Sequence, residues 1–169
     1  MLRNILLEIT GSTSKLRINY DNKLVFEQHY VGETYGGGIV FYTWSGGTHG
    51  LIITTSKVGP DKFWGYSGLL GTSTSIGAGR NNTLLINNAW TGDTAARYCT
   101  GLTWSGYTGW FLPSSGELIE ARKVGVITTF YMSSSESSAT KFTIVGPTTT
   151  GGVVKSTSNT RPFLAVREF

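Results

Sequence analysis

The stretch that decides the fold of this chain is GWFLPSSGELIEA, residues 109–121. Ser114 is followed three residues later by Glu117, the spacing of a capping box, in which each side chain hydrogen-bonds the backbone N–H of the other residue. This spacing predicts a helix that begins directly after Ser114. Lys123 suits the negative end of a helix dipole, and Gly125 can end the helix.

A second helical region is predicted upstream. Apolar residues recur with helical spacing between Leu84 and Cys99, on both sides of the turn-forming segment 91–93. Asp93 or Thr94 could cap the second of these helices. Cys99 lies on the apolar face of that helix, so we interpret this single cysteine as a small buried hydrophobe.

Strand-like segments flank the helices on both sides. Upstream, residues 39–42 and 51–54 form a predicted hairpin across a Gly-rich turn. Residues 57–82 show no sustained period and predict a long structured loop. Downstream, four predicted strands cover residues 130–134, 141–145, 153–157 and 163–169. Helices in the middle and strands at both ends predict an α+β fold, with the terminal strands paired in one sheet.

The first 33 residues have a different pattern. Three short runs alternate apolar and polar positions, at residues 5–9, 16–20 and 24–30, and turn-forming segments separate them. This pattern predicts a small β meander, which is marginally stable alone. We therefore divide the chain into residues 1–33, a β-rich anchoring or oligomerisation segment, and residues 34–169, the main domain.

The composition excludes several classes of function. The 169 residues include 23 glycines, 12% aromatic residues and a net charge of +4, which favours one folded domain over disorder. No apolar run of about 18 residues predicts a membrane span, and residues 1–10 do not match a secretory signal peptide. The cations are scattered, with only Arg122 and Lys123 adjacent. This scatter argues against nucleic-acid binding, which needs a clustered basic surface.

Candidate catalytic and metal-binding residues are few. Glu117 and Glu120 fall on one predicted helix, whereas glycosidases need two opposed carboxyl groups. His29 and His49 are the only histidines, and no nucleophile-elbow motif supports a Ser-His-Asp site. With one cysteine, a closed zinc site would need carboxylates. We predict no catalytic residue, metal or cofactor.

Aromatic residues in the predicted loops are the candidate ligand-binding residues. They lie among Gly, Ser, Thr and Asn, and they are Trp44, Trp64, Tyr66, Trp104 and Tyr107. Aromatic rings supply contact area at a low entropy cost and could stack on the face of a sugar. The alternative, that each ring belongs to the core, stays open for all five.

Short blocks of sequence, in a fixed order over about residues 34–169, resemble a known family. The blocks are Gly36-Gly37-Gly38-Ile39-Val40-Phe41-Tyr42, His49-Gly50-Leu51, Gly71-Thr72-Ser73-Thr74 with Ile76-Gly77-Ala78-Gly79, Ala96 to Cys99, Gly109-Trp110-Phe111-Leu112-Pro113-Ser114 with Glu117-Leu118, Ser133-Ser134-Ser135-Glu136, and Arg161 to Arg167. This order is similar to the C-terminal domain of Legionella collagen-like adhesins, which is related to the Fibrobacter succinogenes major paralogous domain.

The resemblance implies a C-type-lectin-like fold with paired terminal strands, two helices and a long loop region that carries recognition. Members occur in surface adhesins and phage virion proteins, often after a trimerising segment, which implies a homo-oligomer with other virion proteins as partners. The Glu-Pro-Asn and Trp-Asn-Asp motifs of calcium-dependent lectins are not present, so calcium-dependent sugar binding is disfavoured. Backbone carbonyls could still hold a structural calcium ion. Formylglycine-generating enzymes share this broad fold, but their cysteine chemistry does not fit a single helical Cys99.

These considerations lead to one expected function and two alternatives. We expect a non-enzymatic recognition module on a virion surface, as a spike, fibre or capsid-attached head that binds a host glycan or protein. The first alternative is a purely structural virion part that assembles through residues 1–33. The second is a fragment of an adhesin on a bacterial cell surface.

Overall fold

The computed structural model describes residues 16–18 and 24–169, which form a mixed α+β structure, as predicted. The main antiparallel sheet has the order β3-β4-β5-β9, with β3 (Thr34–Tyr35), β4 (Gly38–Trp44), β5 (His49–Ile53) and β9 (Val166–Glu168). A second antiparallel sheet contains β6 (Tyr131–Ser138), β7 (Lys141–Val145) and β8 (Thr150–Val154). The helices are α1 (Gly79–Ala89), α2 (Ala95–Thr100) and α3 (Ser115–Ala121), with 3-10 turns η1 (Ser45–Gly47) and η2 (Arg122–Val124).

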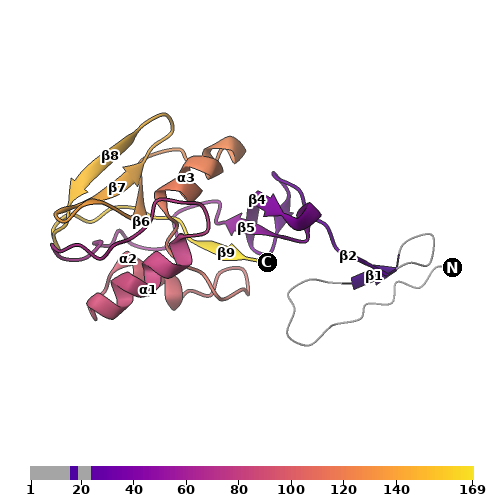
Figure 1. Cartoon of the computed structure of the whole chain (residues 1–169), viewed down its shortest axis with the longest axis horizontal. Helices are drawn as coiled ribbons and strands as arrows, with labels where there is room; N and C mark the ends of the chain where they lie inside the picture. Colours follow the sequence, from indigo (N-terminus) through magenta and orange to yellow (C-terminus); the bar gives the residue numbers. More distant parts are fainter. Residues whose placement is uncertain (1–15, 19–23) are drawn as a thin grey trace.

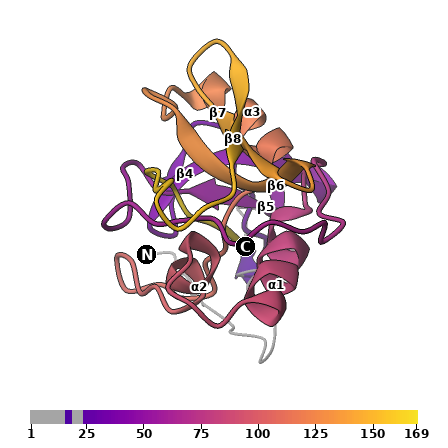
Figure 2. The same cartoon turned by 90° about the vertical axis from the view of Figure 1, so that its left-hand side faces the viewer.

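The main sheet is covered on both faces. Figures 1 and 2 show α1 and α2 on one side of the body and α3 on the other. On β4, Val40 belongs to a first core cluster with residues of α1 and α2, whereas its neighbour Phe41 belongs to a second cluster with Leu118 of α3. Successive side chains of a strand point to opposite faces, so one apolar strand supplies both cores.

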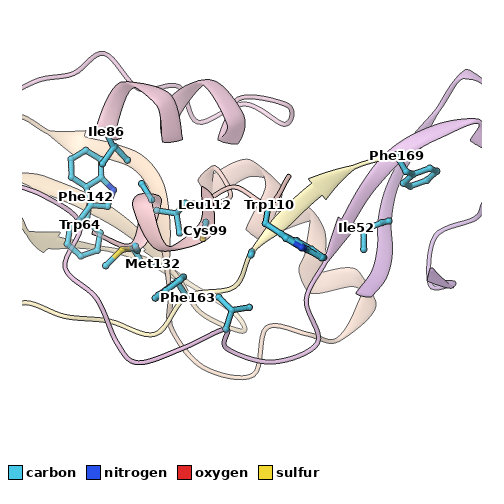
Figure 3. Close-up of a cluster of buried hydrophobic side chains, with 14 of the residues drawn as sticks. Ile52, Trp64, Ile86, Cys99, Trp110, Leu112, Met132, Phe142, Phe163 and Phe169 are labelled. Atoms are coloured by element: carbon cyan, nitrogen blue, oxygen red, sulfur yellow. The ribbon is translucent and has the colours of Figure 1, made fainter. Parts of the chain in front are cut away.

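The first core cluster is the larger of the two. Figure 3 shows Trp64, Met132 and Phe142 at one end of it, Ile52 and Phe169 at the other, and Trp110 between them. Complete burial of one large apolar side chain contributes roughly 1.5–3 kcal/mol. The cluster therefore joins the main sheet, the second sheet and the helices into one body.

The stretch 109–121 joins the two cores, which explains its influence on the fold. Phe111 exchanges two backbone hydrogen bonds with Val166 of β9, at 2.8 and 2.9 Å. The stretch is extended here, so Trp110 faces the first core cluster and Phe111 the second. The predicted capping box then starts α3: Ser114 Oγ accepts from Glu117 N at 3.1 Å, and Glu117 Oε2 accepts from Ser114 N at 2.8 Å.

Glu117 also reaches the beginning of α1. Its Oε1 atom accepts the backbone N–H groups of Gly77 at 2.9 Å and Gly79 at 3.2 Å. The side chain is buried, and burial raises the pKa of Glu117 to about 7, although the N–H donors of Ser114, Gly79 and Gly77 oppose this change. One carboxyl group therefore connects the start of α3 with the start of α1.

The other helix ends also agree with the caps that the sequence predicts. Thr94 caps α2 by accepting the N–H of Arg97, and Gly125 follows η2 with a φ of +76°. Cys99 is buried in the first core cluster, and burial raises the pKa of its thiol. The predicted cap at Thr94, the predicted stop at Gly125 and the predicted burial of Cys99 are confirmed.

The predicted loop 57–82 ends earlier than expected, because α1 begins at Gly79. The long loop of the structure, residues 54–78, contains no helix or strand, and a buried ion pair holds it. Glu136 of β6 accepts the backbone N–H groups of Leu70 and Thr72, and Lys155 Nζ donates to Glu136 Oε1 and to the carbonyl of Gly68. Burial alone would raise the pKa of Glu136, but the hydrogen bonds from Lys155, Leu70 and Thr72 outweigh it and lower the pKa. The loop therefore has a fixed course despite its lack of regular structure.

Two strand predictions need correction. Residues 153–157 were expected as a strand, but β8 is Thr150–Val154 and includes Gly151 and Gly152. Glycine is tolerated there because β8 is an edge strand. In the predicted strand 163–169, only β9 is regular, since the carbonyls of Phe163 and Ala165 accept from Val58 and Thr54 of the loop instead.

The order of strands in the main sheet also differs in detail from the expected pairing of terminal strands. The C-terminal strand β9 pairs with β5, and β5 separates it from β4 and β3. The predicted hairpin of β4 and β5 is confirmed, with a register that runs from Ile39 opposite Ile53 to Trp44 opposite His49.

The N-terminal segment is described in part. β1 (Leu16–Ile18) and β2 (Leu24–Phe26) form an antiparallel ribbon, and Figure 1 shows it beyond the end of the body that contains β4 and β5. The predicted run 5–9 lies outside the described residues. Attachment to the body begins before residue 34: His29 N donates to Gly47 O at 2.8 Å, and the His29 ring stacks on Tyr35 with 3.7 Å between centroids.

Candidate functional site

A tight hairpin presents Trp104 and Tyr107 together. Each residue donates its backbone N–H to the carbonyl of the other, at 2.9 Å in both directions. The two residues between them, Ser105 and Gly106, have φ angles of +50° and +82°, as in the two-residue turns that join twisted strands. Directly opposed residues place their side chains on the same side of a ribbon. The turn therefore puts both aromatic side chains on one face.

Tyr107 lies against an arginine from the C-terminal strand. The guanidinium carbon of Arg167, on β9, is 4.5 Å from the centre of the Tyr107 ring and 5.9 Å from the centre of the Trp110 ring. Trp110 Nε1 donates to the Tyr107 carbonyl at 2.8 Å, which ties the hairpin to the buried core. Tyr107 remains 41% exposed, whereas Trp104 is partly buried and packs on the first core cluster. The side chain of Tyr107 is thus both accessible and held in place.

Two glycines allow Arg167 and the Trp104–Tyr107 hairpin to lie close to the backbone of residues 36 and 37. Arg167 Nε donates to the carbonyl of Gly36 at 3.1 Å. Gly37 has a φ of +93°, and a Cβ atom there would lie 3.1 Å from Tyr107 Cδ2 and 3.3 Å from the Trp104 carbonyl. A side chain at position 37 would push the hairpin away. We call the group formed by Trp104, Tyr107, Arg167, Gly36 and Gly37 the Arg167 site.

The Arg167 site is positively charged at neutral pH. Burial lowers the pKa of Arg167, and Tyr107 and Tyr35 oppose this change. Because the ordinary pKa of an arginine side chain lies far above neutral pH, the guanidinium stays charged. Burial also raises the pKa of Tyr35, with a contribution from Glu27, so Tyr35 stays neutral. A ligand at this site would contact an aromatic surface beside a cation that carries hydrogen-bond donors.

Arg167 is a site residue that the sequence motifs do not predict, although the strand pattern contains a signal for it. In the predicted strand 163–169, Arg167 falls on the same side as Ala165 and Phe169, both of which are buried. A charged residue between two core residues on one side of a strand marks a cation at the edge of the core. Arg167 lies opposite Ile52 of β5, which is itself buried.

One predicted ligand-binding residue is wrong. Trp64 is completely buried, stacks on Phe142 with 6.1 Å between ring centroids, and donates from Nε1 to the Ser133 carbonyl at 2.9 Å. No face of its indole is available to a ligand. Composition suggested a loop position, which is correct, but the loop folds back and inserts this ring into the core.

Trp44 and Tyr66 are exposed but separate from the Arg167 site. Trp44 is 41% exposed at the end of β4, where its ring stacks beside His49 at 6.0 Å. Tyr66 is 49% exposed and makes edge contacts with Phe63 and Trp90. Within the described part of the chain, no ring contact joins either residue to the hairpin. The structure therefore brings together two of the five predicted aromatics, Trp104 and Tyr107.

A surface hollow of about 360 Å³ lies beside α2. It is lined by Asp93, Arg97, Tyr98, Gly101, Leu102 and Thr103. Its charged groups already have partners: Arg97 Nη2 donates to the carbonyls of Asn87 and Trp90 at 2.9 Å, and Asp93 pairs with Lys62. This hollow is therefore a weaker candidate than the Arg167 site.

Other kinds of site are poorly supported. Within residues 16–18 and 24–169, no group of three or more His, Cys, Asp or Glu side chains is placed to hold a metal ion. His29 is buried, with Nδ1 at 3.0 Å from Glu33 Oε1, which indicates a packing role. The same part of the chain has no helix with the length and apolar character to cross a membrane.

Comparison with known proteins adds no identification. No protein-family model matches this chain, and no curated protein matches it. Its function must therefore be inferred from the chemistry of its own residues.

Proposed function

We propose that this protein is a non-enzymatic recognition module of a virion surface, which binds a host glycan or protein through the Arg167 site. The observation that carries the proposal is the exposed Tyr107 side chain, held over Arg167 by a tight hairpin. An aromatic ring fixed before binding loses little conformational freedom when a ligand arrives. Its apolar face suits the C–H face of a sugar or an apolar side chain of a protein.

The architecture supports a C-type-lectin-like fold for this module. The last strand of the chain lies in the same sheet as β3 and β4, helices cover that sheet, and residues 54–78 form a long irregular loop. The resemblance to adhesin domains implies helices, a shared sheet for the terminal strands and a long loop. It also implies two helices and directly paired terminal strands, whereas the structure has three helices and pairs β9 with β5. The proposal includes virion location and homo-oligomeric assembly, for which a trimer is the form that the resemblance favours.

The test of the proposal is a binding measurement with the full chain. We would screen an array of bacterial surface polysaccharides and then compare wild-type protein with Tyr107→Ala. We expect the substitution to weaken binding about tenfold or more, since removal of a central aromatic contact commonly costs over 1 kcal/mol. Tyr66→Ala is the matched control, because Tyr66 is similarly exposed but lies outside the site. Equal effects of the two substitutions would contradict the proposal. If no polysaccharide binds, the glycan ligand is wrong, and the same pair of variants is compared for binding to host surface proteins.

The structural alternative has support from the β1–β2 ribbon. Figure 1 shows this ribbon beyond the body, and among the described residues β1 and β2 pair only with each other. Strand edges of this kind can pair with another chain. A structural role and a display role can both use it. They differ in whether the Arg167 site faces solvent or another virion subunit in the assembly.

Truncation tests the assembly role of the ribbon. We expect the full chain to form an oligomer, and a chain that begins at Glu27 to be a folded monomer, as measured by light scattering after size exclusion. Starting at Glu27 keeps the contacts of His29 with Gly47 and Tyr35. If both chains are monomers, the ribbon does not mediate self-assembly. The better explanation is then that the ribbon docks to another virion protein, or that the chain is a fragment of a bacterial adhesin.

A further inference from the structure

The described residues contain four cations that lie over aromatic rings. The pairs are Lys62 over Tyr98 at 5.4 Å, Arg80 over Phe111 at 4.9 Å, Lys155 over Trp64 at 4.4 Å, and Arg167 over Tyr107 at 4.5 Å. Three of these cations also have a carboxylate partner: Asp93 for Lys62, Glu168 for Arg80, and Glu136 for Lys155. Arg167 is the exception, since no carboxylate of the described residues forms an ion pair with it.

The contrast is sharpest within strand β9 itself. Glu168 pairs with Arg80 at 3.3 Å on one face of the main sheet. Its neighbour Arg167 points to the opposite face, as adjacent residues of a strand do. There its hydrogen bonds to the described residues go only to carbonyl oxygens, with Nε at 3.1 Å from Gly36 O and Nη1 at 3.4 Å from Glu168 O. One face of the strand has a complete ion pair, and the other has a cation without its anion.

The guanidinium of Arg167 retains donors for a ligand. An arginine side chain has five N–H donors in a planar fork. Nε is occupied by Gly36, Nη1 makes one long contact, and Nη2 makes no hydrogen bond to a described residue. None of these nitrogens is among the buried polar atoms without a partner, so Nη2, which lies beside Gly36, is not completely buried. The side chain as a whole is half-buried, and its unused donors are the ones available to an anion.

We propose that the Arg167 site binds the carboxylate of an acidic sugar, with Arg167 holding the carboxylate and Tyr107 contacting the sugar ring. This inference rests on the proposed function and specifies its ligand class. The planar fork of a guanidinium matches the two oxygens of a carboxylate. A single unpaired cation also balances the single charge of a carboxylate better than the double charge of a phosphate. A sugar that carries its carboxylate directly on the ring can reach Arg167 and Tyr107 together.

The first test varies the ligand. An array would present oligosaccharides of uronic and nonulosonic acids, the same compounds as methyl esters, and neutral oligosaccharides, with inorganic phosphate and sulfate as soluble competitors. We expect the acids to bind and the esters to bind at least about tenfold more weakly, because a charge-assisted hydrogen-bond pair is lost. Competition by phosphate or sulfate as strong as that by the acidic sugar would overturn the assignment to a sugar.

The second test varies the protein. Arg167→Gln should abolish binding of the acidic sugar, whereas Arg167→Lys should retain weakened binding because it keeps the charge but loses the fork. Arg80→Gln is the matched control: Arg80 also lies over an aromatic ring, but it already pairs with Glu168, so binding should not change. Thermal unfolding of each variant shows whether it is folded, and the ester comparison tests the proposal on wild-type protein alone.

The outcomes separate this inference from the proposed function. If neutral glycans bind, and Tyr107→Ala weakens their binding while Arg167→Gln does not, the acidic ligand is wrong and the recognition role stands. If nothing on the array binds in a manner that depends on Tyr107, the acidic-sugar inference fails together with the glycan form of the proposed function. Acid-selective binding that is lost in Arg167→Gln and kept in Arg80→Gln supports both.

Discussion

Replacing Lys155 with methionine should destabilise the protein by about 3–5 kcal/mol, the cost of leaving a buried charge without its partner. Lys155 and Glu136 are both buried, and Lys155 also lies 4.4 Å from the centre of the Trp64 ring. Methionine approximates the length of the lysine side chain but provides no charge and no donor for Glu136 Oε1 or the Gly68 carbonyl. Unfolding with denaturant measures the loss.

The control for this substitution is Lys57→Met. Lys57 pairs with Asp61 at 3.2 Å, but its side chain is 55% exposed, and such surface pairs contribute about 0–1 kcal/mol. Hydrogen exchange provides a second readout, because the backbone N–H groups of Leu70 and Thr72 bond to Glu136 and should exchange faster once it is unpaired. A loss no larger than that of Lys57→Met, with unchanged exchange, would contradict the role we assign to Lys155.

The pH dependence of this pair follows from the lowered pKa of Glu136. A carboxyl group with a lower pKa in the folded than in the unfolded state stabilises the fold above its unfolded pKa. That contribution is lost as the pH falls through the folded pKa. Part of the acid unfolding of the wild-type protein should therefore be missing in Lys155→Met.

At about pH 4.5, Glu117→Gln should be the second most damaging change, with a loss of about 1–3 kcal/mol. Both carboxyl oxygens of Glu117 accept backbone N–H groups: Oε1 those of Gly77 and Gly79, and Oε2 that of Ser114. A glutamine must place its NH2 group where one of the carboxyl oxygens was. There the NH2 group, itself a hydrogen-bond donor, would face a backbone N–H donor. Glu120→Gln is the control, since Glu120 is on the same helix and pairs only with exposed Lys123.

The effect of Glu117→Gln should depend on pH. Burial raises the pKa of Glu117 to about 7, so the folded state holds this proton more tightly than the unfolded state, where the pKa is near 4.5. The stability that Glu117 contributes is then complete below about pH 4.5 and declines as the pH rises through about 7, by an amount on the order of 3 kcal/mol. A protonated carboxyl oxygen can still accept an N–H, but an amide nitrogen cannot. The difference between wild type and variant should therefore shrink from pH 4.5 to pH 8, and a difference that grows over this range would contradict the raised pKa.

Local sequence signals predicted the local parts of the fold well. The capping box at Ser114 and Glu117, the Thr94 cap and the glycine at position 125 act within a few residues of themselves, so spacing alone indicates them. What the spacing could not indicate is the second set of contacts that Glu117 makes, with Gly77 and Gly79. Those contacts depend on how the long loop returns to the start of α3.

The candidate site was predictable in part for the same reason. Trp104 and Tyr107 are near neighbours in sequence, and the turn between them brings them together. Arg167 reaches them from the C-terminal strand β9, and no local sequence pattern predicts that contact. Trp64 was misassigned because a loop rich in glycine and serine can still carry a core residue when a distant group, here the Ser133 carbonyl, accepts its indole N–H.

The position of β9 has a consequence for how the body acquires its order. This strand lies between β5 on one side and Phe111 on the other, and it hydrogen-bonds to both. These three segments are widely separated along the chain, so the entropy of closing two large loops must be overcome before their contacts are formed, and pairings of this kind slow folding. Until β9 inserts, the apolar side chains on both faces of β4 and β5 have an incomplete cover. We therefore expect β9 to insert late in folding, and partly folded chains to be most prone to aggregation before it does.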